Sequence, residues 1–248
     1  MFTPERHQYI LQRLAEHGRV SIAELARELD VSDDTVRRDL RVLEKLGGLQ
    51  KTHGGAVCLD LPKTARRARN ALLQPVKQAL GRCAANYPAA GSVLFIDAGS
   101  TVLEVARQLP RHPYTVITHS LDVAACLSER EEIALHLAGG AWDGRQRLFN
   151  GTTAEAFVRR FCADWAILGA CAVDTGVGVT ASEASDAEIK RGMLAASRQA
   201  LLVADHSKFA RHEPHWVAQL SRFDAVITDR APYDAGQDSH FVVPDLQE

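Results

Sequence analysis

The chain has 248 residues, of which 46% are hydrophobic and 24% charged, and it carries a formal net charge of −2. This composition is ordinary for a globular protein, and the near-neutral charge excludes a uniformly basic nucleic-acid binder. The apolar runs are too short for a membrane span, and the N-terminus, MFTPERHQYI, lacks the apolar stretch of a signal peptide. Five cysteines without a Cys-x-x-Cys pair favour buried, reduced thiols. We therefore expect a cytoplasmic protein that does not engage a membrane.

Three short helices are predicted over residues 5–46, where apolar residues recur at helical spacing. The first ends at Gly18, and the second opens with a capping box that runs from Ser21 to Glu24. The third follows a tight turn at 30–32 and has aspartates in its first turn, where the helix dipole favours negative charge. Its buried face is predicted to consist of Val36, Leu40 and Leu43.

The third helix turns Arg37, Arg38 and Arg41 to solvent or to a partner, because its apolar positions lie on another side. Two helices joined by a short turn, the second with basic and hydroxyl residues in its first half, form a helix-turn-helix. Residues 1–57 hold as many acidic as basic residues, so the placement of the arginines, and not their number, favours DNA. A solvated helix face would carry the same charges, and the helix alone leaves that alternative open.

Residues 47–57, GGLQKTHGGAV, hold two glycine pairs around a short polar segment, which predicts a small hairpin. A hairpin that follows a helix-turn-helix is a wing, from which Lys51 and His53 would reach phosphates or a groove edge. The predicted DNA contacts are Ser32, Thr35, Arg37, Arg38, Arg41, Lys51 and His53.

Three motifs of this region occur together: Val20-Ser21, Ser32 to Leu40, and His53 to Ala56. With them, residues 19–57 resemble the winged helix-turn-helix of the DeoR family of bacterial transcriptional regulators. The resemblance implies that the chain binds double-stranded operator DNA. Lys51 stands where family members often carry arginine, which keeps the charge but loses the planar donor fork.

The segment 58–70, CLDLPKTARRARN, is polar and basic and is predicted to be a linker. Beside a DNA-binding module its basic residues could add phosphate contacts that do not depend on base sequence. We thus expect a winged helix-turn-helix domain at 1–57, the linker at 58–70, and a larger domain at 71–248.

From residue 71 the pattern changes to apolar runs that alternate with helical stretches. The runs are short and rich in Val, Ile and Leu, which suits a mostly parallel sheet covered by helices on both faces. Strands are predicted at 92–97, 114–118, 133–138, 164–169, 200–205, 224–229 and 240–244. Helices are predicted at 72–87, 101–109, 121–130, 152–162 and 185–198. The fold class is therefore a mainly α winged helix-turn-helix followed by an α/β domain.

Polar residues collect at the predicted strand ends, where parallel sheets bind ligands. Residues 97–101, Asp-Ala-Gly-Ser-Thr, follow one strand and open a helix, so Gly99 and the helix N-terminus could receive an anion. Lys208, after another strand, offers a compact cation for a phosphate. Each signal is weak alone, because such turns are usually plain loops, and the prediction depends on several strand ends carrying compatible groups.

The same motifs resemble the DeoR sensor domain, which is related in fold to ribose-5-phosphate isomerase and glucosamine-6-phosphate deaminase. The resemblance implies that a phosphorylated sugar or polyol binds there and changes the affinity for DNA. His119 departs from the asparagine usual at its position, residues 180–182 are smaller than in some members, and Asp205 to Phe209 is similar to the glycerol-3-phosphate repressors. The predicted effector-binding residues are Asp97, Gly99, Ser100, Thr101, Thr118, Ser120, Gly139, Gly140, Lys190, Asp205, His206 and Lys208.

Parts of the sequence also fit two other functions. A sugar-phosphate isomerase or deaminase with an appended DNA-binding domain could use a carboxylate as general base, drawn from Asp97, Glu183, Asp186 and Glu188. A metal sensor could use His212 and His215, but no convincing third ligand accompanies them.

We expect a transcriptional repressor of a carbohydrate or polyol catabolic operon that assembles as a homodimer or homotetramer. Its partners would be operator DNA and the phosphorylated effector. No catalytic residue, metal or cofactor is predicted.

Overall fold

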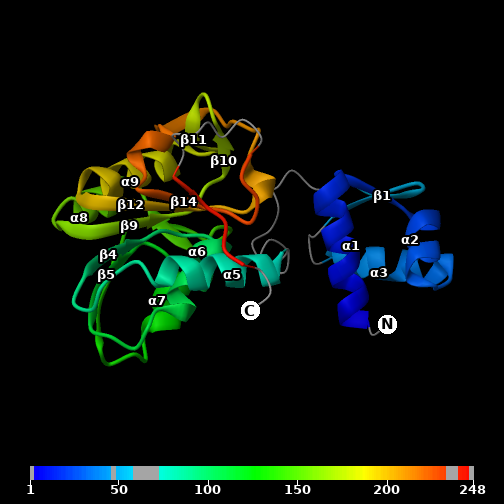
Figure 1. Ribbon diagram of the computed structural model, residues 1–248, viewed down its shortest axis with the longest axis horizontal. Helices are drawn as coiled ribbons and strands as arrows, with labels where there is room; N and C mark the ends of the chain where they lie inside the picture. Colours follow the sequence, from blue (N-terminus) through cyan, green and yellow to red (C-terminus); the bar gives the residue numbers. More distant parts are fainter. Residues whose placement is uncertain (1–2, 46–48, 58–72, 233–239, 246–248) are drawn as a thin grey trace. The chain divides into compact units, whose positions relative to one another are not determined.

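The computed structural model describes residues 3–45, 49–57, 73–232 and 240–245. The chain divides into two compact units, Met1–Gln74 and Pro75–Glu248, called here the N-terminal and C-terminal units (Figure 1). The predicted linker at 58–70 lies outside the described residues.

In its described residues the N-terminal unit contains three helices and a small antiparallel sheet, as the periodicity and the glycine pairs predict. Its elements are α1 (Thr3–His17), β1 (Arg19–Ser21), α2 (Ile22–Leu29), α3 (Asp33–Lys45), β2 (Gln50–Thr52) and β3 (Gly55–Val57). The sheet has the order β1-β3-β2. Strand β1 was not predicted, because three residues carry no readable alternation and their partner lies far along the chain.

Short-range hydrogen bonds set the helix boundaries of this unit. The Ser21 hydroxyl accepts the Glu24 amide at 3.2 Å and begins α2. Asp30, at a left-handed φ of 51°, ends α2, and the Ser32 hydroxyl accepts the Thr35 amide at 3.3 Å at the start of α3. The apolar stripes of the three helices then meet in one core, which includes Ile10, Leu14, Leu25, Val36, Leu40 and Leu43.

Gly55 provides a sharp test of how the wing is attached. A Cβ atom added there would lie 1.9 Å from the carbonyl oxygen of Val20, which is backbone and pairs with β3. Gly55→Ala is therefore expected to separate β1 from β3 and to destabilise the N-terminal unit by about 1–3 kcal/mol or more. Gly54→Ala is the matched control, because a Cβ there meets nothing within 4 Å. Thermal unfolding followed by circular dichroism measures both; equal midpoints would contradict the expectation.

The C-terminal unit is built on a parallel seven-stranded sheet in the order β15-β14-β12-β9-β4-β5-β6. All seven predicted strands are present in it. Their bounds are β4 (Val93–Ile96), β5 (Tyr114–Thr118), β6 (Ile133–Leu137), β9 (Ala163–Leu168), β12 (Ser197–Val203), β14 (Ala225–Ile227) and β15 (Phe241–Val242).

Helices cover both faces of this sheet, which confirms the α/β prediction (Figure 1). Successive strand residues alternate between the two faces: Phe95 packs with α8 and α9, whereas Leu94 and Ile96 pack with α5, α6 and α7. The helices are α5 (Gln74–Ala85), α6 (Ser100–Gln108), α7 (Leu121–Leu127), α8 (Thr152–Val158) and α9 (Ala184–Ala195), with short 3-10 turns η2 (His206–Lys208) and η3 (Leu220–Arg222).

Two small β structures of this unit were not predicted. One is the hairpin of β7 (Ala141–Asp143) and β8 (Leu148–Asn150). The other is a sheet of β10 (Ala172–Asp174), β11 (Gly178–Ala181) and β13 (His215–Ala218). Both lie in stretches that the sequence pattern leaves as loops, because their strands are only three or four residues long.

The cysteines differ in part from the expectation. The four in the described residues are unpaired, as predicted, but Cys162 is exposed and the others are only partly buried. Cys162 lies in the turn between α8 and β9. Within the described ranges, no helix is long and apolar enough to cross a membrane.

Candidate functional site

The third helix presents its arginines as predicted. Arg37, Arg38 and Arg41 are exposed on α3, as is Ser32 just before it, whereas Val36 and Leu40 on the opposite side are wholly buried. Thr35 is half-buried, and its hydroxyl lies 2.9 Å from that of Ser32.

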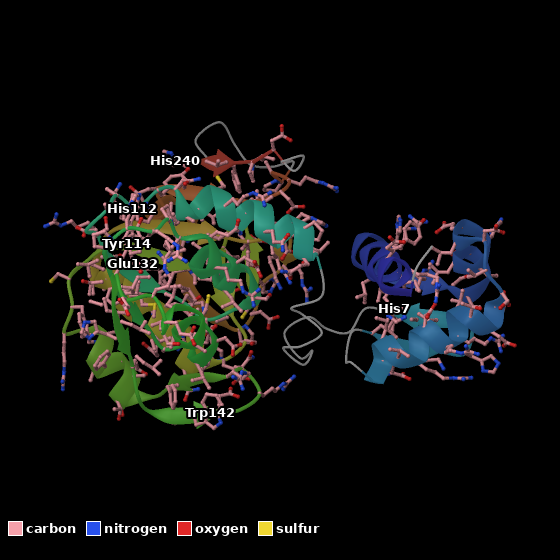
Figure 2. The ribbon with its side chains drawn as sticks, turned by 90° about the horizontal axis from the view of Figure 1, so that it is seen from below. His7, His112, Tyr114, Glu132, Trp142 and His240 are labelled. Atoms are coloured by element: carbon pink, nitrogen blue, oxygen red, sulfur yellow. The ribbon has the colours of Figure 1, made fainter. Side chains whose placement is uncertain are left out.

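Asp39, inside the Arg-Arg-Asp-Leu run, has a different role that the sequence did not reveal. Its carboxylate is buried and accepts hydrogen bonds from Arg6 Nε at 2.5 Å and Arg6 Nη2 at 3.1 Å, and His7 Nε2 lies 2.9 Å away. Burial raises the pKa of Asp39, but the contacts with Arg6 and His7 outweigh it and leave the pKa lowered. Because Arg6 and His7 belong to α1, this contact holds α3 in place (Figure 2 labels His7).

The wing lies beside α3. His53 is exposed in the turn between β2 and β3, and Lys51 is half-buried on β2. The backbone amide of Lys51 donates to Glu44 Oε1 at 3.0 Å, which attaches the wing to the last turn of α3. The predicted DNA-contact residues thus share one compact unit, with the basic side chains on α3 and the hairpin.

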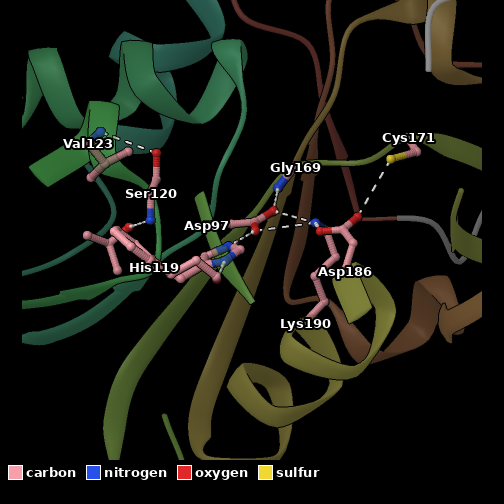
Figure 3. A network of polar contacts seen from close by, with 10 residues as sticks. Asp97, His119, Ser120, Val123, Gly169, Cys171, Asp186 and Lys190 are labelled. Carbon is pink, nitrogen blue, oxygen red and sulfur yellow. Dashed lines mark hydrogen bonds and ion pairs between the residues drawn. The ribbon is translucent and has the colours of Figure 1, made fainter. Parts of the chain in front are cut away.

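A second group of predicted residues meets at the carboxyl ends of the parallel strands (Figure 3). Asp97 follows β4, which lies between β9 and β5 in the sheet, and is completely buried. One oxygen accepts the Gly169 amide at 3.0 Å, the other lies 3.1 Å from His119 Nε2, and Lys190 Nζ approaches within 3.1 Å. Asp97 therefore joins the ends of β4, β5 and β9 to helix α9.

Opposite charges are paired in this cluster. Burial raises the pKa of Asp97, but the positive Lys190 and the contact with His119 outweigh it and lower the pKa to about 2. Lys190 is also buried and pairs with Asp186 one turn earlier on α9 as well as with Asp97. Burial lowers the pKa of Lys190, but the two carboxylates raise it by more. Asp186, which the sequence analysis considered only as a general base, is thus a structural partner.

The hydroxyl groups at the end of β5 accept hydrogen bonds from backbone amides. Ser120 Oγ accepts the Val123 amide at 3.3 Å and caps α7, and Thr118 Oγ1 accepts the Ser120 amide at 3.1 Å. Both residues are completely buried.

Other predicted residues remain accessible. Gly99, at φ 136°, is the N-cap of α6 and is followed by the half-buried Ser100, while Thr101 is buried. The first amides of a helix have no partner inside the helix, so this end offers hydrogen-bond donors. Gly139 and Gly140, after β6, are exposed.

The end of β12 forms a tight turn that carries Lys208. Asp205 is buried and accepts the Ser207 amide at 3.1 Å. Burial raises the pKa of Asp205, but Lys208 and Lys77 outweigh it, so the pKa is lowered. Lys208 itself is half-buried. The buried Lys77 of α5 was not singled out from the sequence, since nothing local distinguishes it from a surface lysine.

His206 in the same turn contacts Asp229, which follows β14 and was also missed. The His206 amide donates to Asp229 Oδ1 at 2.7 Å, and the imidazole Nδ1 lies 2.5 Å from Oδ2. This contact raises the pKa of His206 despite its partial burial.

Cys171 lies near both the Asp97–Lys190 cluster and the turn that carries Lys208. Its Sγ lies 3.7 Å from Asp186 Oδ2. Burial and then Asp186 raise the pKa of the Cys171 thiol, and the charges of Lys190 and Lys208 act in the opposite direction. Both lysines therefore lie within electrostatic range of this partly buried thiol.

Two family models match the chain, and their matched ranges correspond closely to the two compact units. Residues 6–61 match the DeoR-like helix-turn-helix domain, and residues 74–230 match the DeoR C terminal sensor domain. The chain belongs to the DeoR family. It is therefore a DNA-binding transcriptional regulator with a sensor domain.

Relatives align along nearly the whole chain. The transcriptional repressor AccR of Agrobacterium fabrum is 33% identical over 92% of this chain and 90% of its own length. The glycerol-3-phosphate regulon repressor of Escherichia coli is 33% identical over 92% and 91%. The repressor GlcR of Bacillus subtilis is 32% identical over 95% and 92%.

Among solved structures, ribose 5-phosphate isomerase A of Methanocaldococcus jannaschii matches over 55% of this chain and 55% of its own, with 15% identity and a TM-score of 0.42.

Proposed function

We propose that this DeoR-family regulator is a repressor that binds its operator through α3 and the wing and is released by a phosphorylated sugar or polyol. The effector would bind at the carboxyl ends of the parallel strands. The regulated genes would form a carbohydrate or polyol catabolic operon.

One observation carries the effector proposal: at the strand ends the carboxylates are already paired, whereas the accessible groups are donors or cations. Asp97 is buried against Lys190 and His119, and Asp205 is buried in its own turn near Lys208 and Lys77. The amide end of α6 and the half-buried Lys208 remain for a ligand. Such a surface suits an anion, and a phosphate accepts from both kinds of donor.

The predicted effector residues then have two roles. Direct contact falls to the accessible ones, Gly99, Ser100, Gly139, Gly140, His206 and Lys208, together with the amide of Thr101. Support falls to the buried and paired ones, Asp97, Thr118, Ser120, Lys190 and Asp205. Lys190 acts indirectly, because two carboxylates already neutralise its charge.

The relatives support this class of effector. Two of them are glycerol-3-phosphate regulon repressors of Escherichia coli and Haemophilus influenzae, each 33% identical to the chain. A glycerol-3-phosphate-like polyol phosphate is therefore the first candidate to test.

The geometry around Asp97 argues against this residue as the general base of an isomerase or deaminase. A general base at neutral pH needs a pKa near the working pH and a free lone pair. Asp97 has neither, since its pKa lies at about 2 and its oxygens meet Gly169, His119 and Lys190.

A panel of phosphorylated sugars and polyols tests the proposal. The true effector should raise the melting temperature of the pure protein and release it from operator DNA, and its unphosphorylated form should do neither. Turnover of ribose 5-phosphate or glucosamine 6-phosphate is measured in parallel. If the protein turned over either compound, or if no phosphorylated compound stabilised it, the proposal would fail.

Arg38→Ala tests the DNA-binding half of the proposal. If Arg38 contacts a guanine from α3, the variant should bind the operator about 1–3 kcal/mol more weakly and discriminate less against other DNA. Arg27→Ala removes the same charge from an exposed position on α2 and is the matched control. Gel-shift titrations on specific and random DNA separate the cases: equal weakening on both indicates a phosphate contact. Unchanged binding would remove Arg38 from the interface.

The proposed assembly is a homodimer or homotetramer, because helix-turn-helix proteins usually read two half-sites with two copies. Light scattering of the free protein and of its operator complex would measure the number of chains; one chain per operator would contradict it.

A further inference from the structure

His119 is a completely buried histidine whose two ring nitrogens both face oxygen atoms (Figure 3). Its Nε2 lies 3.1 Å from Asp97 Oδ1, and its Nδ1 lies 3.0 Å from the backbone carbonyl oxygen of Phe149. No solvent reaches either nitrogen, so these two oxygens must satisfy the ring.

Neither oxygen can donate a hydrogen. The Phe149 carbonyl is only an acceptor. The Asp97 carboxylate accepts from the Gly169 amide and faces Lys190, which are the contacts of an ionised group. A neutral imidazole has one N–H, so it would turn a lone pair toward one of the two acceptors in a dry interior. Such a buried mismatch is costly.

We propose that both ring nitrogens of His119 carry hydrogen, and that the resulting buried imidazolium fixes the β7–β8 hairpin to the effector site and strengthens anion binding there. The charges then balance: Asp97 and Asp186 are negative, and Lys190 and His119 are positive. A neutral His119 would leave this buried cluster with one uncompensated negative charge, which is unfavourable. The nearby Cys171 adds no charge as a thiol and can donate to Asp186.

The hairpin is attached to the end of β5 at and around His119. The Phe149 amide donates to the His119 carbonyl at 2.9 Å, which makes the contact between these residues reciprocal. The Leu121 amide donates to the Arg147 carbonyl at 3.0 Å, and Arg147 Nε pairs with Asp122 at 2.7 Å. The hairpin is therefore held by His119, the same residue that contacts Asp97.

At its other end the hairpin joins a predicted effector segment. It follows Gly139 and Gly140, and a Cβ at Gly140 would lie 2.5 Å from the Asn150 carbonyl oxygen, so the hairpin base is closely packed. On its surface the exposed Trp142 packs against Phe149, with ring centroids 5.1 Å apart, and it stands at the rim of the unit in Figure 2. His119 is thus a positioning residue that links Asp97 to the β7–β8 hairpin.

The effector part of this inference rests on the proposed function, whereas the hydrogen count on His119 does not. Nitrogen-15 NMR of the imidazole in the wild-type protein, without any added anion, decides that count. Two nitrogens with directly bonded hydrogen are expected. One nitrogen without hydrogen would overturn the inference, whatever the protein binds.

His119→Asn tests the consequence, because asparagine is compact and polar but uncharged. His136→Asn is the matched control, since His136 is a partly buried histidine of β6 that packs on Phe161 away from this cluster. Hydrogen exchange at the Phe149 and Leu121 amides should accelerate in the first variant only. Unchanged exchange would overturn the positioning role.

Anion binding is measured with inorganic phosphate and glycerol 3-phosphate as probes, by thermal shift and by release from operator DNA. His119→Asn should require about tenfold more of whichever probe acts on the wild type, with operator affinity unchanged. If His119→Asn needed the same probe concentration as the wild type, the proposed effect on anion binding would be overturned. If neither probe, nor any other phosphorylated compound, acts on the wild type, the proposed function fails, while the NMR and exchange results still decide the inference about His119.

Discussion

Asp97→Ala is expected to lower the free energy of unfolding of the C-terminal unit by about 3–5 kcal/mol. The variant leaves the Lys190 ammonium with one carboxylate instead of two and removes the acceptor of His119. It also leaves the buried Gly169 amide without its partner. Each loss takes place in an interior that water cannot enter, so the cost of the unpaired groups is not recovered by solvation.

Denaturant unfolding of the full chain measures this effect. Glu131→Ala is the control, because it removes one carboxylate from an exposed position in the same unit, and it should change stability by less than about 0.5 kcal/mol. The double variant Asp97→Ala with Lys190→Met removes both partners and should recover part of the loss. If Asp97→Ala were as stable as the control, the cluster would not hold the strand ends together.

The same carboxylate predicts how stability depends on pH. The pKa of Asp97 is about 2 in the folded protein, below the ordinary value of 3.8. A lowered pKa means that the ionised form stabilises the fold above pH about 4, and that this contribution disappears as the pH falls toward 2. The Asp97 contribution to the stability difference between wild type and Asp97→Ala should therefore be fully present above pH about 4 and shrink between pH 4 and 2. A difference that grows on acidification would contradict this sign.

Lys208→Ala is expected to abolish release by effector while leaving the fold and DNA binding intact. Lys208 is half-buried beside Asp205 and is the accessible cation of the proposed site. A phosphate that binds there gains charge-assisted hydrogen bonds, each worth about 1.5–3 kcal/mol. Without them the effector should bind at least about tenfold more weakly, and the repressor should remain on DNA.

Arg198→Ala is the matched control for this experiment. Arg198 lies near the start of β12, whereas Lys208 follows the end of the same strand. The side chain of Arg198 is 85% exposed. The Arg198→Ala variant removes one positive charge near the amino end of β12, opposite the end that Lys208 follows. Operator titrations of both variants, with and without glycerol 3-phosphate and the other candidate effectors, give the answer. If Lys208→Ala left DNA at the wild-type effector concentration, Lys208 would not be the phosphate partner.

Local features of the chain were enough to predict its helices and the seven strands of the parallel sheet, but not the short strands outside that sheet. Helices and strands are recognised by the period of their apolar residues, and caps such as Ser21 act over three residues, so both signals are contained in short segments. The nearly continuous apolar runs indicated a sheet buried on both faces, and all seven strands lie in it. The DeoR motifs likewise lie in unbroken stretches of sequence.

The tertiary structure alone decided which polar residues are paired and which are accessible. Lys190 and Lys208 look alike in the sequence, but Lys190 is enclosed by Asp97 and Asp186, whereas Lys208 stays partly exposed. Asp39 lies between DNA-reading candidates but pairs with Arg6 of another helix. These outcomes depend on strand order and helix packing, which join residues tens of positions apart. A local pattern contains no information about the partner across such a distance, and the partner determines whether a charge is buried or available to a ligand.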